Sequence, residues 1–134
     1  MKIVLDANIF ISSFFWGGNL RLVLERVIEG IDELFISKEI LDEIESVMGR
    51  VKFHADKEKI AYYINSIEEI GNKIVPKSRI KNGSRDKSDN KYLECGISAN
   101  VDYIISGDMD LLELKEYKKI KIVTAKDYLE IKKK

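Results

Sequence analysis

Short apolar runs alternate along the chain with segments in which apolar residues recur at helical spacing. Residues 3–5 and 34–36 are continuously apolar, as in strands that are buried on both faces of a parallel sheet. The predicted strands are residues 3–5, 34–36, 73–75, 102–106 and 120–123. The predicted helices are residues 20–28, 40–48, 56–70, 89–99, about 109–114 and the C-terminal stretch before the lysine-rich tail. Strands that alternate with helices predict an α/β fold, a three-layer α/β/α sandwich with a mainly parallel sheet.

The composition is that of a folded protein. Of the 134 residues, 45% are hydrophobic and 34% are charged, and no repeat or low-complexity linker divides the chain, so we expect one domain over residues 1–134. Basic and acidic residues both number 23, which excludes an overall cationic field but not a local basic patch. Cys95 is the only cysteine, so an internal disulfide and a cysteine-rich zinc site are excluded. No stretch resembles a signal peptide or a membrane span, and we expect a cytoplasmic protein.

Acidic residues follow two of the predicted strands. Asp6 comes directly after residues 3–5, and Asp108 closely follows residues 102–106, with Asp110 two positions beyond. Parallel sheets bind ligands outside the carboxyl ends of their strands, which makes these acids candidates for a site. The alternative is helix capping, since Asp is favoured at helix N-termini. Capping suits Asp108 and Asp110 well, but it suits Asp6 less, because apolar residues continue after it.

Two predicted helices carry further acids. Asp89 opens one of them and projects from the same side as its apolar residues, either as a first-turn acid or as part of a site. Asp86 precedes it as a cap or a supporting group. On the helix after the second strand, Glu43 and Glu45 flank the apolar stripe equally, so periodicity does not choose between them. Asp42 on the same helix faces solvent.

A divalent cation would explain why such acids gather. If Asp6, Asp89 and Asp108 converge with one of the two glutamates, their mutual repulsion raises their pKa values unless a positive charge is present. Mg²⁺ and Mn²⁺ prefer oxygen ligands and use few carboxylates directly. A cation in such a site activates water and neutralises a phosphodiester, so the pattern favours metal-assisted phosphoryl hydrolysis.

Three blocks of the sequence resemble a PIN domain. They are VLDANIFISSFF near the start, ISKEILDEIESVM in the first third, and RDKSDNKYLECGISANVDYIISGDMDLLEL in the last third. Their order and spacing match the family, and the likeness covers nearly the whole chain. It is greatest to the compact VapC-like ribonucleases, the toxin components of toxin–antitoxin pairs.

The resemblance implies a Mg²⁺- or Mn²⁺-dependent endoribonuclease that hydrolyses single-stranded RNA in an acidic pocket at the carboxyl end of a parallel sheet. It matches Glu43, rather than Glu45, to the family's second acid. The catalytic set that it implies is Asp6, Glu43, Asp89 and Asp108, of which Asp6, Asp89 and Asp108 are the metal ligands. The supporting groups that it implies are Asn8, Ser106, Asp86 and Asp110. It also implies three partners: an RNA substrate, a cognate antitoxin protein and a second copy in a homodimer.

Basic residues crowd the loop that leads into Asp89. The candidate RNA-binding residues there are Arg79, Lys81, Arg85 and Lys87. They either flank the acidic site and hold phosphates or belong to a solvated loop, and the sequence leaves both interpretations open.

Trp16 suits an interface or the core better than stacking on a base. No acid is placed to partner His54, the only histidine, so we assign it no catalytic role.

Other acidic α/β proteins fit the sequence less well. A receiver-type phosphoacceptor needs paired acids after its first strand, and a haloacid-dehalogenase-type phosphatase needs Asp-x-Asp there, whereas this chain has Asp6-Ala7-Asn8. The remaining rival is a non-catalytic or weakly active PIN-fold module that binds RNA or acts as a scaffold. A scaffold has no reason to tolerate clustered carboxylates, so the nuclease is the favoured interpretation.

Overall fold

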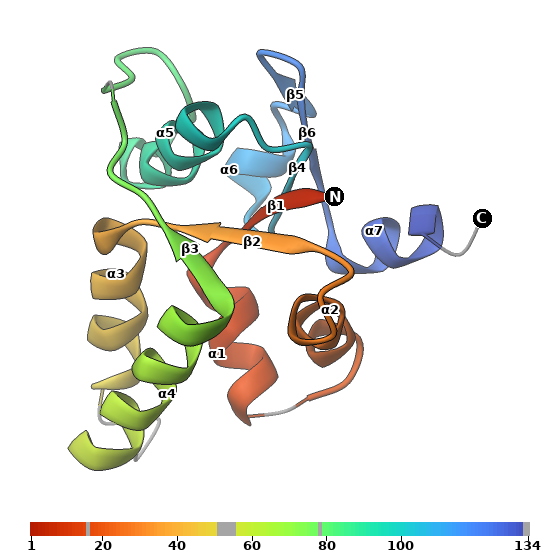
Figure 1. The fold of residues 1–134 in the computed structure, drawn as a ribbon. Coiled ribbons are helices and arrows are strands. Elements are labelled where there is room, and N and C mark those ends of the chain that lie inside the picture. The colour runs from red at the N-terminus through yellow and green to blue at the C-terminus, as the bar shows by residue number, and fades with distance from the viewer. Residues whose placement is uncertain (16, 51–55, 78, 133–134) are drawn as a thin grey trace.

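A mainly parallel sheet runs through the centre of the computed structural model (Figure 1). The structure describes residues 1–15, 17–50, 56–77 and 79–132, so Trp16 and His54 lie outside the described residues. The strands of the described part are β1 (Lys2–Leu5), β2 (Glu33–Ile36), β3 (Gly71–Lys73), β4 (Tyr103–Ile105), β5 (Glu116–Tyr117) and β6 (Ile120–Val123). Their order is β3-β2-β1-β4-β6-β5, and all neighbours pair in parallel except β5 and β6.

Helices cover both faces of this sheet, which confirms the predicted three-layer fold. They are α1 (Ala7–Phe15), α2 (Asn19–Ile28), α3 (Lys38–Met48), α4 (Lys57–Ile70), α5 (Asn90–Ala99), α6 (Met109–Leu112) and α7 (Ala125–Lys132), with the 3₁₀-helix η2 at Lys87–Asp89. Helix α5 packs against β1, β2 and β4, whereas α1 and α2 lie on the opposite side of the sheet (Figure 1). None of the helices in the described ranges combines the length and the apolar character needed to cross a bilayer.

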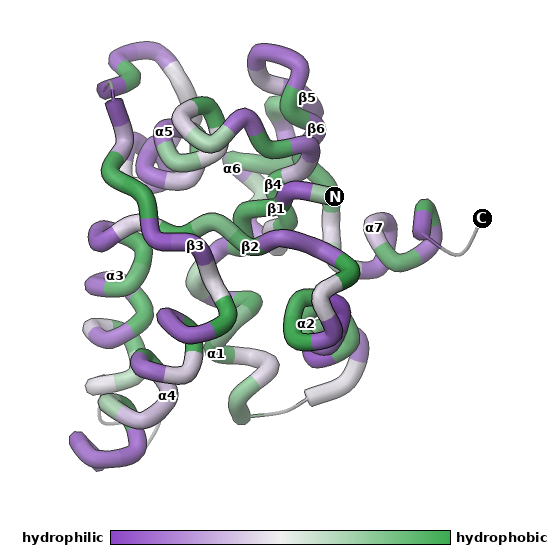
Figure 2. Tube along the Cα trace, viewed as in Figure 1, coloured by the Kyte–Doolittle hydropathy of each residue, from purple (hydrophilic) through white to green (hydrophobic). Residues whose placement is uncertain are grey.

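Side-chain caps fix the starts of α3 and α4. The hydroxyl of Ser37 accepts a hydrogen bond from the backbone N–H of Ile40 at 3.4 Å, and Asp56 accepts one from Lys59 at 2.8 Å. Helix α3 then turns its apolar stripe inward and its hydrophilic residues outward, as Figure 2 shows. The cap and the stripe together fix which side of α3 faces α5.

The structure corrects three predictions of secondary structure. Residues 9–15 lacked a predicted helix, yet they belong to α1, in which residues 9–11 are consecutive buried apolar residues and so show no helical period. The third strand is β3 rather than residues 73–75, so it starts directly where α4 ends. The short antiparallel strand β5 was not predicted, because two residues are too few to show alternation.

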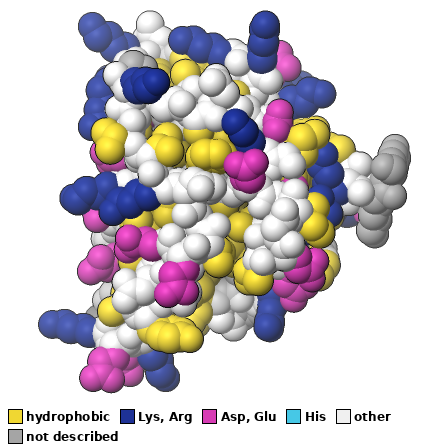
Figure 3. Space-filling view, viewed as in Figure 1, with side chains coloured by type: hydrophobic (Ala, Val, Ile, Leu, Met, Phe, Trp, Pro, Cys, Tyr) yellow, Lys and Arg dark blue, Asp and Glu magenta, His cyan; other side chains and the backbone are white. Residues whose placement is uncertain are grey.

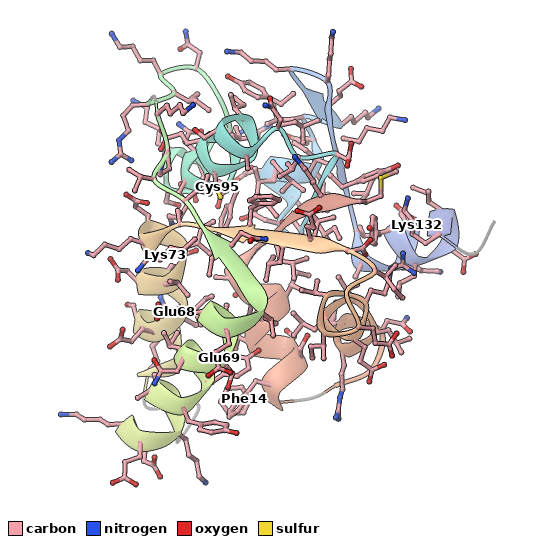
Figure 4. The ribbon with its side chains drawn as sticks, in the orientation of Figure 1. Phe14, Glu68, Glu69, Lys73, Cys95 and Lys132 are labelled. Atoms are coloured by element: carbon pink, nitrogen blue, oxygen red, sulfur yellow. The ribbon has the colours of Figure 1, made fainter. Side chains whose placement is uncertain are left out.

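Helix α5 lies unusually close to the sheet. A Cβ atom added to Gly96 would lie 3.1 Å from Val101 and 3.3 Å from Ile104, so a larger residue here would push the helix away. Cys95 on the same helix is fully buried next to the sheet (Figure 4), and burial raises the pKa of its thiol to about 12. A buried thiol of this kind packs as a small apolar side chain. The close packing of α5 sets the position of every functional side chain that it carries.

The β5–β6 hairpin holds two lysines in a left-handed backbone conformation. Lys118 and Lys119 form its two-residue loop, between the paired residues Tyr117 and Ile120, and their φ angles are 47° and 74°. Two-residue hairpin loops with positive φ at both positions favour Asn-Gly, and non-glycine residues there are strained by roughly 1–2 kcal/mol each.

We expect the double change Lys118→Asn with Lys119→Gly to raise the free energy of unfolding by about 1 kcal/mol. The gain is smaller than the relieved strain because glycine also gains freedom in the unfolded chain. Urea unfolding at neutral pH measures it, with Lys121→Asn on the adjoining strand as the control that is not expected to stabilise. A double variant no more stable than the original chain would show that the lysines are not strained.

Candidate metal-binding and catalytic site

Strands β1 and β4 bring their carboxyl ends together at the middle of the sheet. The backbone N–H of Asp6 donates to the carbonyl of Ile105 at 3.0 Å, so Asp6 and Ser106 leave the sheet side by side. The chain crosses from β1 to β2 on one side of this point and from β4 to β6 on the other. Such a switch in strand order opens a crevice in which α/β proteins bind ligands.

Both carboxylate oxygens of Asp6 are held by hydrogen bonds. Its Oδ1 accepts from the backbone N–H of Asn8 at 2.7 Å, and its Oδ2 accepts from the hydroxyl of Ser106 at 2.6 Å. Asp6 therefore caps α1, although the sequence made capping seem a poor explanation for it. Burial raises the pKa of Asp6; its hydrogen bonds oppose this effect, and the nearby charges of Glu43 and Asp108 add to it.

Asn8 supports Asp6 through its backbone and not through its side chain. The side chain of Asn8 is exposed, and within the described residues it makes no hydrogen bond to the carboxylate. The expected supporting role therefore belongs to the N–H at the start of α1. Any residue other than proline supplies that group at this position.

Ser106 connects the two acids that follow the central strands. Its fully buried hydroxyl donates to Asp6 and accepts from the backbone N–H of Asp108 at 2.9 Å. Asp108 in turn caps α6, because its Oδ1 accepts from the backbone N–H of Asp110 at 2.8 Å. Capping is thus correct for Asp108, but it occupies one carboxylate oxygen and leaves the other available.

Asp89 is the acid that capping does not explain. It lies at the start of α5 without a side-chain cap, is buried, and has no donor to its Oδ2 among the described residues. Burial and the charge of Asp108 raise the pKa of Asp89 to about 7, with smaller contributions from Asp86 and Asp6. Asp108 is close enough to share a hydrogen bond with it, which forms only when one of the two acids is protonated. A buried carboxylate without a donor is costly, and a cation removes that cost.

Two acids that were expected only as supporting groups also lie close to Asp89. One carboxylate oxygen each of Asp86, Asp89 and Asp110 lies within 4.8 Å of the other two, and within the described part of the chain this is the group of three acids, histidines or cysteines that is spaced to hold a metal. Asp86 also caps η2 by accepting from the backbone N–H of Ser88. Asp89 thus belongs to this group and is also affected by the charges of Asp108 and Asp6.

The structure separates the two glutamates of α3 that helical periodicity alone could not rank. Glu45 is exposed, whereas Glu43 faces α5, where Lys91 Nζ lies 2.9 Å from its Oε1 and the hydroxyl of Tyr92 donates to its Oε2. Tyr92 also accepts a hydrogen bond from the backbone N–H of Ala7 at 3.1 Å. Sequence reasoning missed Lys91 and Tyr92, because a helical lysine usually faces solvent and the tyrosine lies on the apolar stripe.

Two of the four basic residues in the loop before α5 form ion pairs with acids of the protein. Arg79 pairs with the buried Glu94 at 3.1 Å, and Arg85 pairs with Glu113 at 2.7 Å. Lys81 and Lys87 are exposed and make no ion pair with the described residues. Figure 3 shows lysine and arginine side chains gathered at the top of the molecule, over this loop and the β5–β6 hairpin. RNA binding by the four residues remains a prediction.

The donor set fits a hard divalent cation. We call the six acids the acid cluster; they are Asp6, Glu43, Asp86, Asp89, Asp108 and Asp110. All of its ligand atoms are carboxylate oxygens, which Mg²⁺ and Mn²⁺ prefer, and no sulfur or imidazole ligand occurs in the cluster. The Oδ2 atom of Asp89 gives a second, independent indication of a bound cation, since it is buried and lacks a donor within the described residues.

Comparison with known proteins places the chain in a family. A family model described as PIN domain matches residues 2–110. No curated protein matches the chain at a significant level. Among solved structures, the chain is similar to one in the crystal structure of VapBC2 from Rickettsia felis bound to a DNA fragment from their promoter, with a TM-score of 0.63 and 13% identity over 91% of this chain and 97% of that chain.

A second solved structure gives the same result. It is VapBC-1 from nontypeable Haemophilus influenzae, with a TM-score of 0.63 and 17% identity over 94% of this chain and 99% of that chain. At such low identities the two likenesses demonstrate a common fold and nothing finer. The family model covers most of the chain, and its match shows that this protein belongs to the PIN domain family.

Proposed function

We propose that the protein is a Mg²⁺- or Mn²⁺-dependent endoribonuclease that hydrolyses phosphodiester bonds of single-stranded RNA. The observation that carries the proposal is Asp89, a buried acid whose pKa is raised to about 7 and which is surrounded by other carboxylates. Membership of the PIN domain family supports it. Asp89, Asp108 and Asp6 would hold the cation, and Asp86 and Asp110 lie close enough to Asp89 to assist.

The chain's own residues prepare the site before any substrate arrives. Ser106 fixes the distance between Asp6 and the loop of Asp108 through two hydrogen bonds, so the two acids move together. The N-termini of α1 and α5 face the cluster and favour negative charge there. When bound, the cation would activate water and stabilise the negative charge that develops on the phosphate.

We propose further that the protein is the toxin of a toxin–antitoxin pair. The resemblance to VapC-like ribonucleases and the common fold with chains of two VapBC structures support this. In this proposal residues 1–134 act as one PIN-like domain in the cytoplasm, as a homodimer that a cognate antitoxin protein binds.

Cleavage of a short single-stranded RNA by the purified protein tests the proposal. We expect cleavage with Mg²⁺ or Mn²⁺, its loss in EDTA, and a decrease of at least about 100-fold in Asp6→Asn, since that change removes one of the charges that face the cation. Asp42→Asn is the matched control, because Asp42 is exposed on α3 and pairs with Lys38 outside the acid cluster. Cleavage that persists in EDTA, or in Asp6→Asn at the control's rate, would refute the metal-dependent mechanism. A chain that binds RNA without cutting it would support the scaffold instead.

A further inference from the structure

A cation of the protein itself already lies at the edge of the acid cluster. Lys91 forms an ion pair with Glu43, a member of the cluster, and no other lysine or arginine among the described residues pairs with a cluster acid. Lys91 is also near enough to Asp86 to lower the pKa of that acid, after the larger effects of its hydrogen bonds to Ser88. Its side chain is only 18% exposed, so this lysine is not a solvated surface residue.

Glu43 is held from two sides by consecutive residues of α5. The ammonium of Lys91 donates to Oε1, and the hydroxyl of Tyr92 donates to Oε2. The hydroxyl of Tyr92 is itself fixed by the N–H of Ala7, and its ring is buried, so it cannot move aside without disturbing the start of α1. Because one of its two donors is a full positive charge, Glu43 is poorly placed to bind a cation directly, whereas both donors to Asp6 are neutral.

We propose that Lys91 is a positioning residue that, together with Tyr92, holds Glu43 as a neutralised pair beside the metal site and outside its ligand set. This inference rests on the proposed function. It assigns two tasks to Lys91: it fixes the Glu43 carboxylate, and it reduces the negative charge that an approaching phosphodiester meets. A divalent cation balances only part of the charge of six carboxylates, and Lys91 balances a further part.

The proposal predicts opposite effects on metal binding and on catalysis. In Lys91→Met, which keeps the length of the side chain but loses its charge, the cluster becomes more negative and Glu43 is released. Mn²⁺ should therefore bind about 3- to 10-fold tighter than in the original chain. Cleavage should nevertheless fall by about 10- to 100-fold, through kcat more than through KM, because Glu43 is no longer fixed.

Calorimetric titration of the full chain with Mn²⁺ in the absence of RNA tests this, followed by cleavage kinetics. Lys91→Arg should restore Mn²⁺ affinity to within about twofold of the original, since it keeps the charge. Lys38→Met is the matched control, because it breaks an exposed lysine–aspartate pair on α3 that includes no member of the cluster. Circular dichroism of each variant establishes that it is folded.

The outcomes separate this inference from the proposed function. An original chain that fails to bind Mn²⁺ contradicts the proposed function, and the role of Lys91 fails with it. If the original chain binds Mn²⁺ but Lys91→Met binds it equally or more weakly, the positioning role is wrong and the metal site stands. A variant with unchanged kcat and a raised KM would instead make Lys91 a group that binds the substrate phosphate.

Discussion

Asp89→Asn is expected to reduce cleavage of RNA by roughly 10³-fold and, at the same time, to make the metal-free protein more stable. Activity falls because the amide cannot supply the charge that the cation needs from the acid at the centre of the cluster. Stability rises because asparagine carries no charge to bury, and because Asp108 can accept a hydrogen bond from its amide. The same residue would thus contribute function and cost stability.

The gain in stability should depend on pH in a defined direction. The pKa of Asp89 is raised by burial from 3.8 to about 7, so ionisation of this group opposes folding. The original chain has no such penalty below pH 4, acquires it as the pH rises, and carries it fully above pH 7. In EDTA, the advantage of Asp89→Asn in the free energy of unfolding should therefore grow from near zero at pH 4 to on the order of 1 kcal/mol at pH 8 after screening by solvent. Thermal melts of both proteins across this range measure it. A variant less stable than the original chain at pH 8 would contradict a raised pKa.

Asp32→Asn is expected to lower the free energy of unfolding by about 2–4 kcal/mol, the largest loss of stability that we foresee. The fully buried carboxylate of Asp32 accepts from Arg26 Nε and from the hydroxyl of Tyr128, both at 2.8 Å, and lies 3.3 Å from the N-terminal amine of Met1. These contacts join α2, α7 and the start of β1 at the amino-terminal end of the sheet. Asparagine would leave a partly buried guanidinium without its counter-charge.

The effect of Asp32→Asn should shrink in acid. Burial alone would raise the pKa of Asp32, but the hydrogen bonds from Arg26 and Tyr128 outweigh burial and lower it below 3.8. The contribution of this carboxylate is therefore complete above pH 4 and is lost as the pH falls through its folded-state pKa. Urea unfolding between pH 7 and pH 3 follows this trend. Asp42→Asn, which breaks an exposed ion pair, should cost less than about 0.5 kcal/mol.

If the difference in the free energy of unfolding between the original chain and Asp32→Asn widens as the pH falls, Asp32 is not the stabilising group. Asp32 lies at the opposite end of the sheet from the acid cluster, so the folded variant should bind Mn²⁺ as the original chain does. Measuring Mn²⁺ binding by the folded variant therefore separates a loss of stability from a loss of function.

Asp6 and Asp108 were predictable because each comes soon after an apolar strand, and such positions are visible in the sequence alone. Asp6 follows β1, whose last three residues are buried, and Asp108 closely follows the buried strand β4, so parallel pairing alone brings them to one edge of the sheet. The capping of α3 by Ser37 was predictable for a similar reason, since donor and acceptor are three residues apart. Local spacing is what a single sequence records best.

Contacts between distant residues could not be predicted in this way. Glu43 and Lys91 are 48 positions apart, and their pairing depends on how α3 and α5 pack side by side (Figure 1). Asp32 follows a glycine turn and would pass for an exposed turn residue, yet its partner Tyr128 comes from the last helix. Helix α1 was not predicted because its consecutive buried residues 9–11 remove the amphipathic signal. In each case tertiary packing, and not local pattern, decides the outcome.

The position of a bound divalent cation is the most direct test of the account. A crystal of the protein soaked in Mn²⁺ and measured at the manganese absorption edge would locate it by anomalous scattering. We predict a peak within the acid cluster in which Asp89 is a ligand and the Glu43 carboxylate remains paired with Lys91. The absence of a peak at the cluster at saturating Mn²⁺, or a peak that Asp89 does not contact, would contradict the account.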